Sequence, residues 1–220
     1  MAEWGLPRLL ELLTPEEVAL VAAAATRRKY RDGEIVHERG DEHATIGVVI
    51  DGKIKLVYPS RDGHEIFSGL IHSGQNYGDA AYVHGTTRAH RAVAVGETVI
   101  DHIDHAAFAR LLQHAGIARA LYRVACYRLS VTLDMLDDMR LLRPVQRLAK
   151  LILRMHRASG ALRLEFLQED FASILGVSSV TLAKSLRQLE EQGVIETGYR
   201  HIRINDAAHL EAWVREEVPD

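Results

Sequence analysis

The chain has 220 residues, 47% of them hydrophobic, and a formal net charge of −3. This length allows one large domain or two small ones, each with a buried core, and the near-neutral charge means that a polyanion has to be bound through a local basic patch. A single cysteine, Cys126, excludes an internal disulfide and a metal cluster held by several thiolates of one chain.

The N-terminal part of the chain shows no export or membrane signal. No apolar run reaches the ~20 residues that a membrane span needs, and the first residues lack the basic start and cleavage site of an export signal, so we expect a cytoplasmic protein. Residues 6–25 predict two short helices, because Thr14 suits a helix N-cap and Pro15 the first helical position.

The pattern changes to β-type over residues 30–102. Short runs rich in β-branched residues alternate there with turn signals. These signals are Asp32-Gly33, Gly40-Asp41, Asp51-Gly52, Asp62-Gly63 and Ser73-Gly74. Such regular spacing predicts antiparallel hairpins folded into a sandwich or a jelly-roll-like β-roll.

A long helix is predicted next. A short helix covers residues 105–114, Gly116 is a break, and a stretch without Gly or Pro then runs to Pro144. One side of the long helix is apolar, with Ile117, Leu121, Val124, Ala125, Val131, Met135 and Met139. Because this face is wider than one packing seam, we expect the helix to pair in parallel with its counterpart in a second copy, which makes the protein a homodimer.

Arg128 lies on the apolar side of that helix. A lone cation in apolar surroundings costs several kcal/mol unless it meets an anion. Arg128 therefore either pairs with an anion or extends its guanidinium to water.

The C-terminal part predicts a DNA-binding domain. Pro144 starts another helix, which makes Arg143-Pro144 the natural hinge between two domains. Residues 168–192 then combine a helix, a tight turn at Gly176 and a second helix from Ser179, which is the pattern of a helix-turn-helix. Two short strands around residues 197–200 follow as a β-wing, so we expect double-stranded DNA as a partner.

The charge of this part is balanced. From Pro144 onward there are 10 Lys and Arg against 11 Asp and Glu. DNA binding therefore requires the cations to share one face, with the acids turned away. The candidate cations are Lys184, Arg187, Arg200, His201 and Arg203. We expect a modest and salt-sensitive affinity.

With these features the chain resembles the Crp/Fnr family of bacterial transcription regulators over nearly its whole length. The motifs that carry the resemblance in the roll are Gly33-Glu34-Ile35, Gly40-Asp41, Asp51-Gly52, Asp62-Gly63, Gly74 and Tyr77-Gly78-Asp79. The resemblance implies an α+β fold in three parts: a cyclic-nucleotide-binding-like β-roll effector domain (residues 1–115), a central dimerisation helix (residues 116–143) and a winged helix-turn-helix domain (residues 144–220). It also implies a non-enzymatic regulator that contacts RNA polymerase and reads a near-palindromic site with two recognition helices about one DNA turn (~34 Å) apart.

The effector site that the resemblance implies runs from Gly78-Asp79 to Arg88-Ala89. A turn with free N–H groups and Arg88 would hold a cyclic phosphate, while Asp79 would accept from a ribose hydroxyl. Arg128 and Thr132 fall where family members place helix residues that meet this carboxylate and the base. Asp79 stands in place of the usual Glu, and Ala89 in place of a residue whose hydroxyl bonds the phosphate. Losing one such hydrogen bond costs about 1.5–3 kcal/mol.

The sequence does not identify the effector. It is a cyclic nucleotide, a different small molecule, or none, in which case the pocket is vestigial and the regulator binds DNA unaided. A haem sensor with His64, His72 or His90 as ligand is a further alternative, whereas one cysteine excludes an iron–sulfur sensor. Outside the family, a cupin-like enzyme would need a His/Glu metal cluster that the histidine positions do not supply. A nucleotide-binding regulatory subunit for a protein partner would leave the helix-turn-helix without a role.

The recognition helix departs from the family pattern. The candidate DNA-binding residues are Ser178, Ser179, Val180, Thr181, Lys184 and Arg187, with Arg200 from the wing. Many family members have Arg-Glu here, which read guanine and cytosine, whereas Val180 can contact only an apolar group such as a thymine methyl. We predict a half-site that differs at those positions, with hydroxyl and phosphate contacts from Ser179, Thr181 and Lys184. The alternative is that Val180 packs inside and contacts no base.

Overall fold

The computed structural model describes residues 6–42, 45–59, 65–165 and 167–218. These residues form two compact units that meet within one helix, between Leu129 and Ser130. We call residues 6–129 the roll unit and residues 130–218 the winged-helix unit, and describe each by itself. The domain boundaries expected at 115/116 and 143/144 stay predictions.

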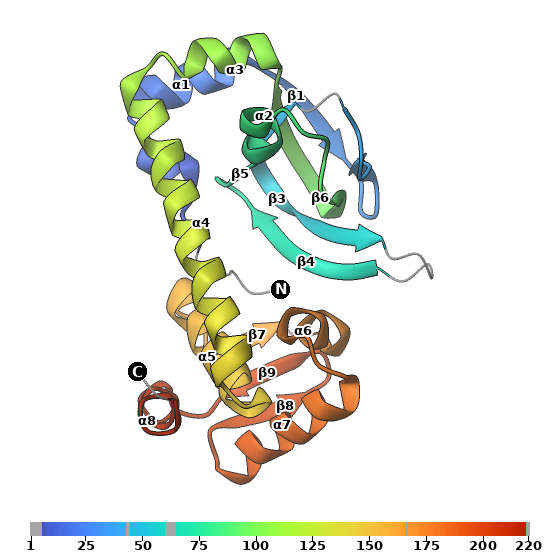
Figure 1. The fold of residues 1–220 in the computed structure, drawn as a ribbon, viewed down its shortest axis with the longest axis vertical. Coiled ribbons are helices and arrows are strands. Elements are labelled where there is room, and N and C mark those ends of the chain that lie inside the picture. The colour runs from blue at the N-terminus through green and yellow to red at the C-terminus, as the bar shows by residue number, and fades with distance from the viewer. Residues whose placement is uncertain (1–5, 43–44, 60–64, 166, 219–220) are drawn as a thin grey trace. The chain divides into compact units, whose positions relative to one another are not determined.

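The roll unit is built on an antiparallel sheet, as predicted. Its strands are β1 (Ala25–Tyr30), β2 (Ile35–His37), β3 (Ile46–Pro59), β4 (Glu65–His72), β5 (Asn76–Tyr77) and β6 (Arg91–Ile103). β6 pairs with β1, β2 and β3, and β3 also pairs with β4 and β5 (Figure 1). The turn predicted at Asp62-Gly63 lies outside the described residues.

The turn predicted at Asp51-Gly52 is wrong. One strand, β3, runs through both residues, and its pairing with β6 shifts register on either side of Asp51. Gly52 has a φ of 78°, and a Cβ added there would lie 2.4 Å from the backbone oxygen of Glu97. The Asp-Gly pair therefore bends a continuous strand by an irregularity of the bulge type instead of ending it.

The helices of the roll unit are η1 (Leu9–Leu12), α1 (Pro15–Ala23), α2 (Asp79–His84) and α3 (His105–Leu111). The capping expected for α1 is present, because the Thr14 hydroxyl accepts from the Glu17 backbone while the Glu17 carboxylate accepts from the Thr14 backbone. α2 was not predicted from the sequence. The break predicted at Gly116 is wrong, since α4 (Ala115–Leu141) already includes it.

Close packing explains the glycine in α4. A Cβ at position 116 would lie 1.6 Å from the Glu17 carboxylate of α1. The first turns of α4 are buried with α3 and the sheet, through Ile117, Ala120, Leu121 and Val124. Beyond Val124 the large apolar residues that α4 exposes in a single chain are Tyr127, Leu129, Leu133, Leu136, Met139 and Leu141.

The winged-helix unit continues from the end of α4. Its elements are α5 (Pro144–Ser159), β7 (Arg163–Glu165), α6 (Gln168–Leu175), α7 (Ser179–Glu191), β8 (Ile195–Gly198), β9 (His201–Ile204) and α8 (Ala207–Glu217). The predicted helix-turn-helix of α6 and α7 and the predicted wing of β8 and β9 are both present. β7, which pairs with β9, and α8 were not predicted.

Two local signals set the helix-turn-helix. Gly176 ends α6 with a φ of 62°, a conformation that side chains disfavour. Ser178 then caps α7, because its hydroxyl accepts from the Thr181 backbone N–H at 3.2 Å. The hydrophobic core of this unit includes Phe171, Leu182 and Leu189, so α7 packs firmly against α5 and α6.

Candidate effector cavity and DNA-binding surface

A cavity of about 190 Å³ lies in the roll unit beside α2. The segment from Tyr77 to His90 forms most of its wall, and β2 and β3 add His37 and Leu56. Three of the six predicted effector residues, Gly78, Arg88 and Ala89, therefore line one cavity. The tertiary fold also places His37 in this lining, a residue that was not predicted from the sequence to bind the effector.

Arg88 is the buried cation of this cavity. Its side chain is only 5% exposed, and it donates to the backbone carbonyl of Thr45. A Cβ at Gly78 would lie 2.0 Å from Arg88 Nη1, so the glycine is what lets the guanidinium lie there. Burial lowers the pKa of Arg88, yet a guanidinium stays charged inside a protein. Within the described residues Arg88 makes no ion pair, and its buried Nε has no hydrogen-bond partner.

Asp79 faces α4. Arg128 Nη1 donates to both of its carboxylate oxygens, at 3.2 and 3.3 Å, and Arg128 Nη2 donates to the Asn76 backbone carbonyl. Of the two alternatives expected for Arg128, pairing with an anion is therefore the one present, and the anion is Asp79. Asp79 itself is absent from the cavity lining. Thr132 lies on the exposed surface of α4 beyond the roll unit.

His37 lies in the cavity wall. Its ring stacks on Tyr77 with centroids 5.6 Å apart and 22° between the planes. Burial, and then the charge of Arg88, lower the pKa of His37 to about 4, so the ring is neutral near pH 7. Burial also raises the pKa of Tyr77, which keeps its phenol protonated. Within the described chain neither His37 Nδ1 nor Tyr77 Oη, both buried, has a hydrogen-bond partner.

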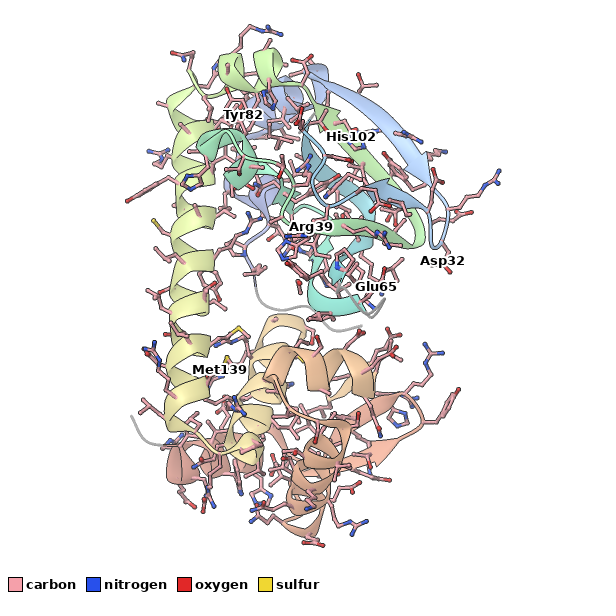
Figure 2. All side chains as sticks on the ribbon, turned by 45° about the vertical axis from the view of Figure 1, so that its right-hand side comes forward. Asp32, Arg39, Glu65, Tyr82, His102 and Met139 are labelled. Atoms are coloured by element: carbon pink, nitrogen blue, oxygen red, sulfur yellow. The ribbon has the colours of Figure 1, made fainter. Side chains whose placement is uncertain are left out.

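The other histidines of the roll unit differ in their surroundings. No group of three His, Cys, Asp or Glu residues suited to a metal ion occurs among the residues that the structure describes. Of the haem-ligand candidates, His90 lines the cavity and its pKa is lowered by burial and Arg39. His72 ends β4, and His64 lies outside the described residues. His102, on β6, is labelled in Figure 2. Both of its ring nitrogens have partners, Tyr30 at 2.8 Å and Thr45 at 3.2 Å.

The candidate DNA-binding surface lies on α7. Ser179, Val180, Lys184 and Arg187 are all exposed, and Val180 is 65% exposed. The alternative that Val180 packs inside is therefore wrong. Thr181 is half-buried, and its hydroxyl bonds that of the capping Ser178 at 3.0 Å, so these two residues also fix the start of α7.

The wing presents two residues at its tip. Tyr199 is 88% exposed, and Arg200 has a φ of 59°, which is unusual for a residue with a side chain. Arg200 is among the DNA-binding residues predicted from the sequence, whereas Tyr199 is not, although its place between the two wing strands could have signalled it. The expectation that all nearby acids turn away is wrong, because Arg203 pairs with Glu196 across the wing. Among the described residues, Lys184, Arg187 and Arg200 make no ion pair.

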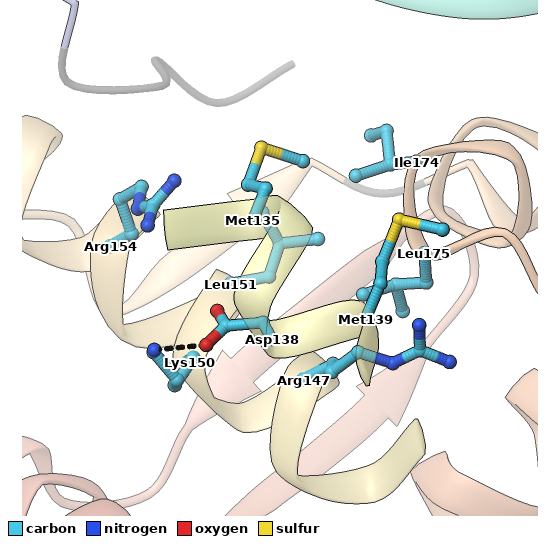
Figure 3. Close-up of a pocket in the computed structure, with 9 residues that line it drawn as sticks. All are labelled: Met135, Asp138, Met139, Arg147, Lys150, Leu151, Arg154, Ile174 and Leu175. Atoms are coloured by element: carbon cyan, nitrogen blue, oxygen red, sulfur yellow. Dashed lines mark hydrogen bonds and ion pairs between the residues drawn. The ribbon is translucent and has the colours of Figure 1, made fainter. Parts of the chain in front are cut away.

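The end of α4 is fixed to α5 within the winged-helix unit. Lys150 Nζ donates to Asp138 at 2.5 Å, beside a hollow of about 30 Å³ whose apolar lining includes Met135, Met139 and Leu151 (Figure 3). Such a hollow has room for about one or two water molecules. It is a packing feature next to the Arg143-Pro144 link and is too small for an organic ligand.

Comparison with known proteins agrees with both halves of this architecture. The profile described as "Cyclic nucleotide-binding domain" matches residues 27–115, and the profile described as "Crp-like helix-turn-helix domain" matches residues 146–213. Together they cover most of the chain. The chain belongs to the Crp/Fnr family of transcription regulators.

Individual relatives of this Crp/Fnr regulator span nearly its full length. It is 26% identical to the cyclic AMP receptor protein of Thermus thermophilus over 200 residues, which are 90% of this chain and 93% of that protein. It is 24% identical to the cAMP-activated global transcriptional regulator Vfr of Pseudomonas aeruginosa over 180 residues, which are 77% of this chain and 84% of that one. These relatives are transcription regulators.

A solved structure gives the same fold. The c-di-GMP responsive global regulator CLP of Xanthomonas campestris has a TM-score of 0.73, with 18% identity over 88% of this chain and all of that one. At this identity the likeness concerns the fold alone. The names also show that regulators of this architecture respond to different nucleotides.

No helix of the described residues is long and apolar enough to span a bilayer.

Proposed function

We propose that this Crp/Fnr regulator acts as a homodimer whose affinity for a near-palindromic DNA site is controlled by a small anionic effector in the roll cavity. The effector class that we propose is a cyclic nucleotide. The observation that carries the proposal is Arg88, a buried guanidinium that faces the cavity without an ion-pair partner in the described chain. A buried cation is costly unless an anion accompanies it, and a cyclic phosphate would supply one.

The cavity fits part of such a ligand. Its volume of about 190 Å³ lies below the ~300 Å³ typical of pockets that enclose a drug-sized ligand. We infer that the phosphate enters the cavity while the sugar and the base extend beyond its lining, which does not include Asp79. Gly78 and Arg88 would bind the phosphate. Asp79, held by Arg128, would accept from a sugar hydroxyl, and Thr132 would meet the base.

The proposed dimer rests on the exposed apolar side chains of α4. Leu129 and Leu133 are 60% and 51% exposed in a single chain and belong to the series of exposed apolar residues along α4. An exposed apolar patch of this kind marks an interface. Pairing along α4 would cover them and would bring two α7 helices to one DNA duplex. The effector can change DNA affinity only to the extent that it binds the DNA-binding arrangement of the dimer more tightly than the other arrangement. We propose RNA polymerase as the further partner of the DNA-bound dimer.

On DNA, we propose that Lys184, Arg187 and Arg200 contact phosphates, with Ser178, Ser179 and Thr181 as hydroxyl partners. Val180 would contact a thymine methyl. The phosphate contacts set affinity and register, and the contact from Val180 contributes to sequence preference.

The test is titration of full-length protein with cAMP and with cGMP while its affinity for DNA selected from a random pool is measured. We expect one of the two nucleotides to tighten DNA binding. If neither changes the affinity and the protein alone already protects a defined site, the regulator is effector-independent and the proposed control is wrong.

A further inference from the structure

His37 enters the effector cavity by way of a strand irregularity. β2 pairs with β6 at Ile35 and again at His37, and the register shifts between these two positions. An extra residue in one strand re-aims the neighbouring side chain, and bulges of this kind often lie next to binding sites. Here the result is a side chain of β2 that lines the same cavity as Arg88 and Ala89.

One nitrogen of the His37 ring has no partner in the described chain, although the ring has a hydrogen bond with the backbone of His90. That nitrogen, Nδ1, is buried. His102 in the same unit provides the contrast, because Tyr30 and Thr45 bond its two ring nitrogens. Buried polar atoms almost always have a partner in native structures, and an exception calls for a reason such as a ligand.

A second polar atom without a partner belongs to the same cavity lining. Arg88 is more than nine-tenths buried, and its Nε also lacks a partner in the described chain. The residue after it, Ala89, has no hydroxyl to offer a ligand. The cavity lining thus contains one buried cation, three imidazoles (His37, His84 and His90) and no carboxylate, which favours an anion that accepts several hydrogen bonds.

We propose that His37 is a second polar contact for the anionic group of the effector, acting beside Arg88 and replacing the hydroxyl that position 89 does not provide. The ligand class is an oxyanion of the phosphate type. This inference rests on the proposed function, since both concern the same cavity. It adds a specificity residue that neither the sequence analysis nor the resemblance assigned.

The charges around His37 suit this role. The groups that act on its ring are Arg88, Asp41, His102 and the backbone of His90, and burial has the largest effect. Burial, Arg88 and His102 lower the pKa of the ring, whereas Asp41 and the hydrogen bond with the His90 backbone raise it. Since that bond uses the one N–H of the neutral ring, Nδ1 donates to an anion only once the ring takes up a second proton. An anion bound by Arg88 would offset the charge that disfavours protonation of His37. We therefore expect the pKa of His37 to rise from about 4 when the cavity is occupied.

The experiment follows histidine side-chain resonances of the full-length protein by NMR at pH 7, with inorganic phosphate, cAMP and cGMP as probes. His37→Phe keeps a ring that can stack on Tyr77 and removes both nitrogens. His209→Phe is the matched control, because His209 is exposed on α8 in the other unit. We expect a saturable shift of the His37 resonances, and binding of that probe about tenfold or more weaker in His37→Phe, with no change in His209→Phe.

The outcomes separate the two proposals. A cyclic nucleotide that binds and changes DNA affinity equally in wild type and His37→Phe overturns the role of His37 and leaves the proposed function intact. A His37 shift with phosphate alone, while neither nucleotide affects DNA binding, supports the role of His37 and contradicts the cyclic-nucleotide effector. Absence of any shift with all three probes, together with DNA affinity that neither nucleotide changes, overturns both.

Discussion

The roll cavity and the α7 surface hold their cations in opposite ways. Arg88 is buried and tied to a backbone carbonyl, whereas Lys184 and Arg187 are exposed and make no ion pair in the described chain. A fixed, buried cation suits a small anion of defined shape, because its position is set before the ligand arrives. Exposed cations suit a polyanion, whose binding grows with the number of contacts and weakens with salt. The net charge of −3 reveals neither arrangement.

Disrupting the dimer at α4 should separate the two kinds of binding most clearly. DNA binding should need two copies of the chain, whereas anion binding in one roll cavity should not. Leu129→Asp with Leu133→Asp places two carboxylates on the exposed apolar face of α4. We expect a monomer by analytical ultracentrifugation and a loss of DNA affinity of about 100-fold or more, since two linked heads bind far more tightly than one.

Asp134→Ala is the control for that experiment, as it alters an exposed polar position of the same helix. It should leave both the dimer and DNA affinity unchanged. A double-aspartate variant that stays dimeric would show that the copies pair elsewhere.

The second prediction concerns charge on α7. Replacing Lys184 and Arg187 together by Ala should weaken DNA binding by between about tenfold and 100-fold at low salt. The slope of log affinity against log salt should become flatter by about 1 for each phosphate contact removed. Arg215→Ala removes an exposed cation from α8 and serves as the control. Equal losses in the control and the double variant would mean that overall charge, and not the α7 surface, binds DNA.

The third prediction restores a hydroxyl to the cavity. Ala89 is exposed at the cavity edge, so Ala89→Ser should fold normally. One added hydrogen bond to a charged phosphate should tighten cyclic-nucleotide binding by about tenfold, measured by calorimetry. Ala106→Ser on the exposed surface of α3 is the matched control. Unchanged affinity in Ala89→Ser would place the phosphate away from position 89.

The smallest expected effect is at Val180. Val180→Ala shortens the apolar side chain that faces outward from α7, so preference for a thymine at one position of each half-site should fall by a few-fold. Selection from random DNA measures this preference directly. Val83→Ala, a change at another exposed valine, in the roll unit, should leave the selected sequence unaltered. Selected half-sites with guanine or cytosine at the position that Val180 faces would contradict the contact.

Sequence patterns succeeded where short-range signals govern the backbone. The helix-turn-helix follows from a glycine at a left-handed position and a capping serine, both of which act within a few residues. The same reasoning failed for α2, which spans six residues between two glycines and is too short to show a helical repeat. It failed at Asp51-Gly52 because strand pairing with β6 overrides a local turn signal.

By itself the sequence determined the antiparallel roll, the long helix with an apolar side, the winged helix-turn-helix and therefore the family. Only the tertiary structure decided which side chains share the cavity. Arg128 bonds Asp79 across 49 positions of sequence, and His37, beside a strand irregularity, lines the same cavity as Arg88. The reason is that periodicity reports which way a side chain faces within its own element. Burial and unmet hydrogen bonds depend on which distant elements pack against it.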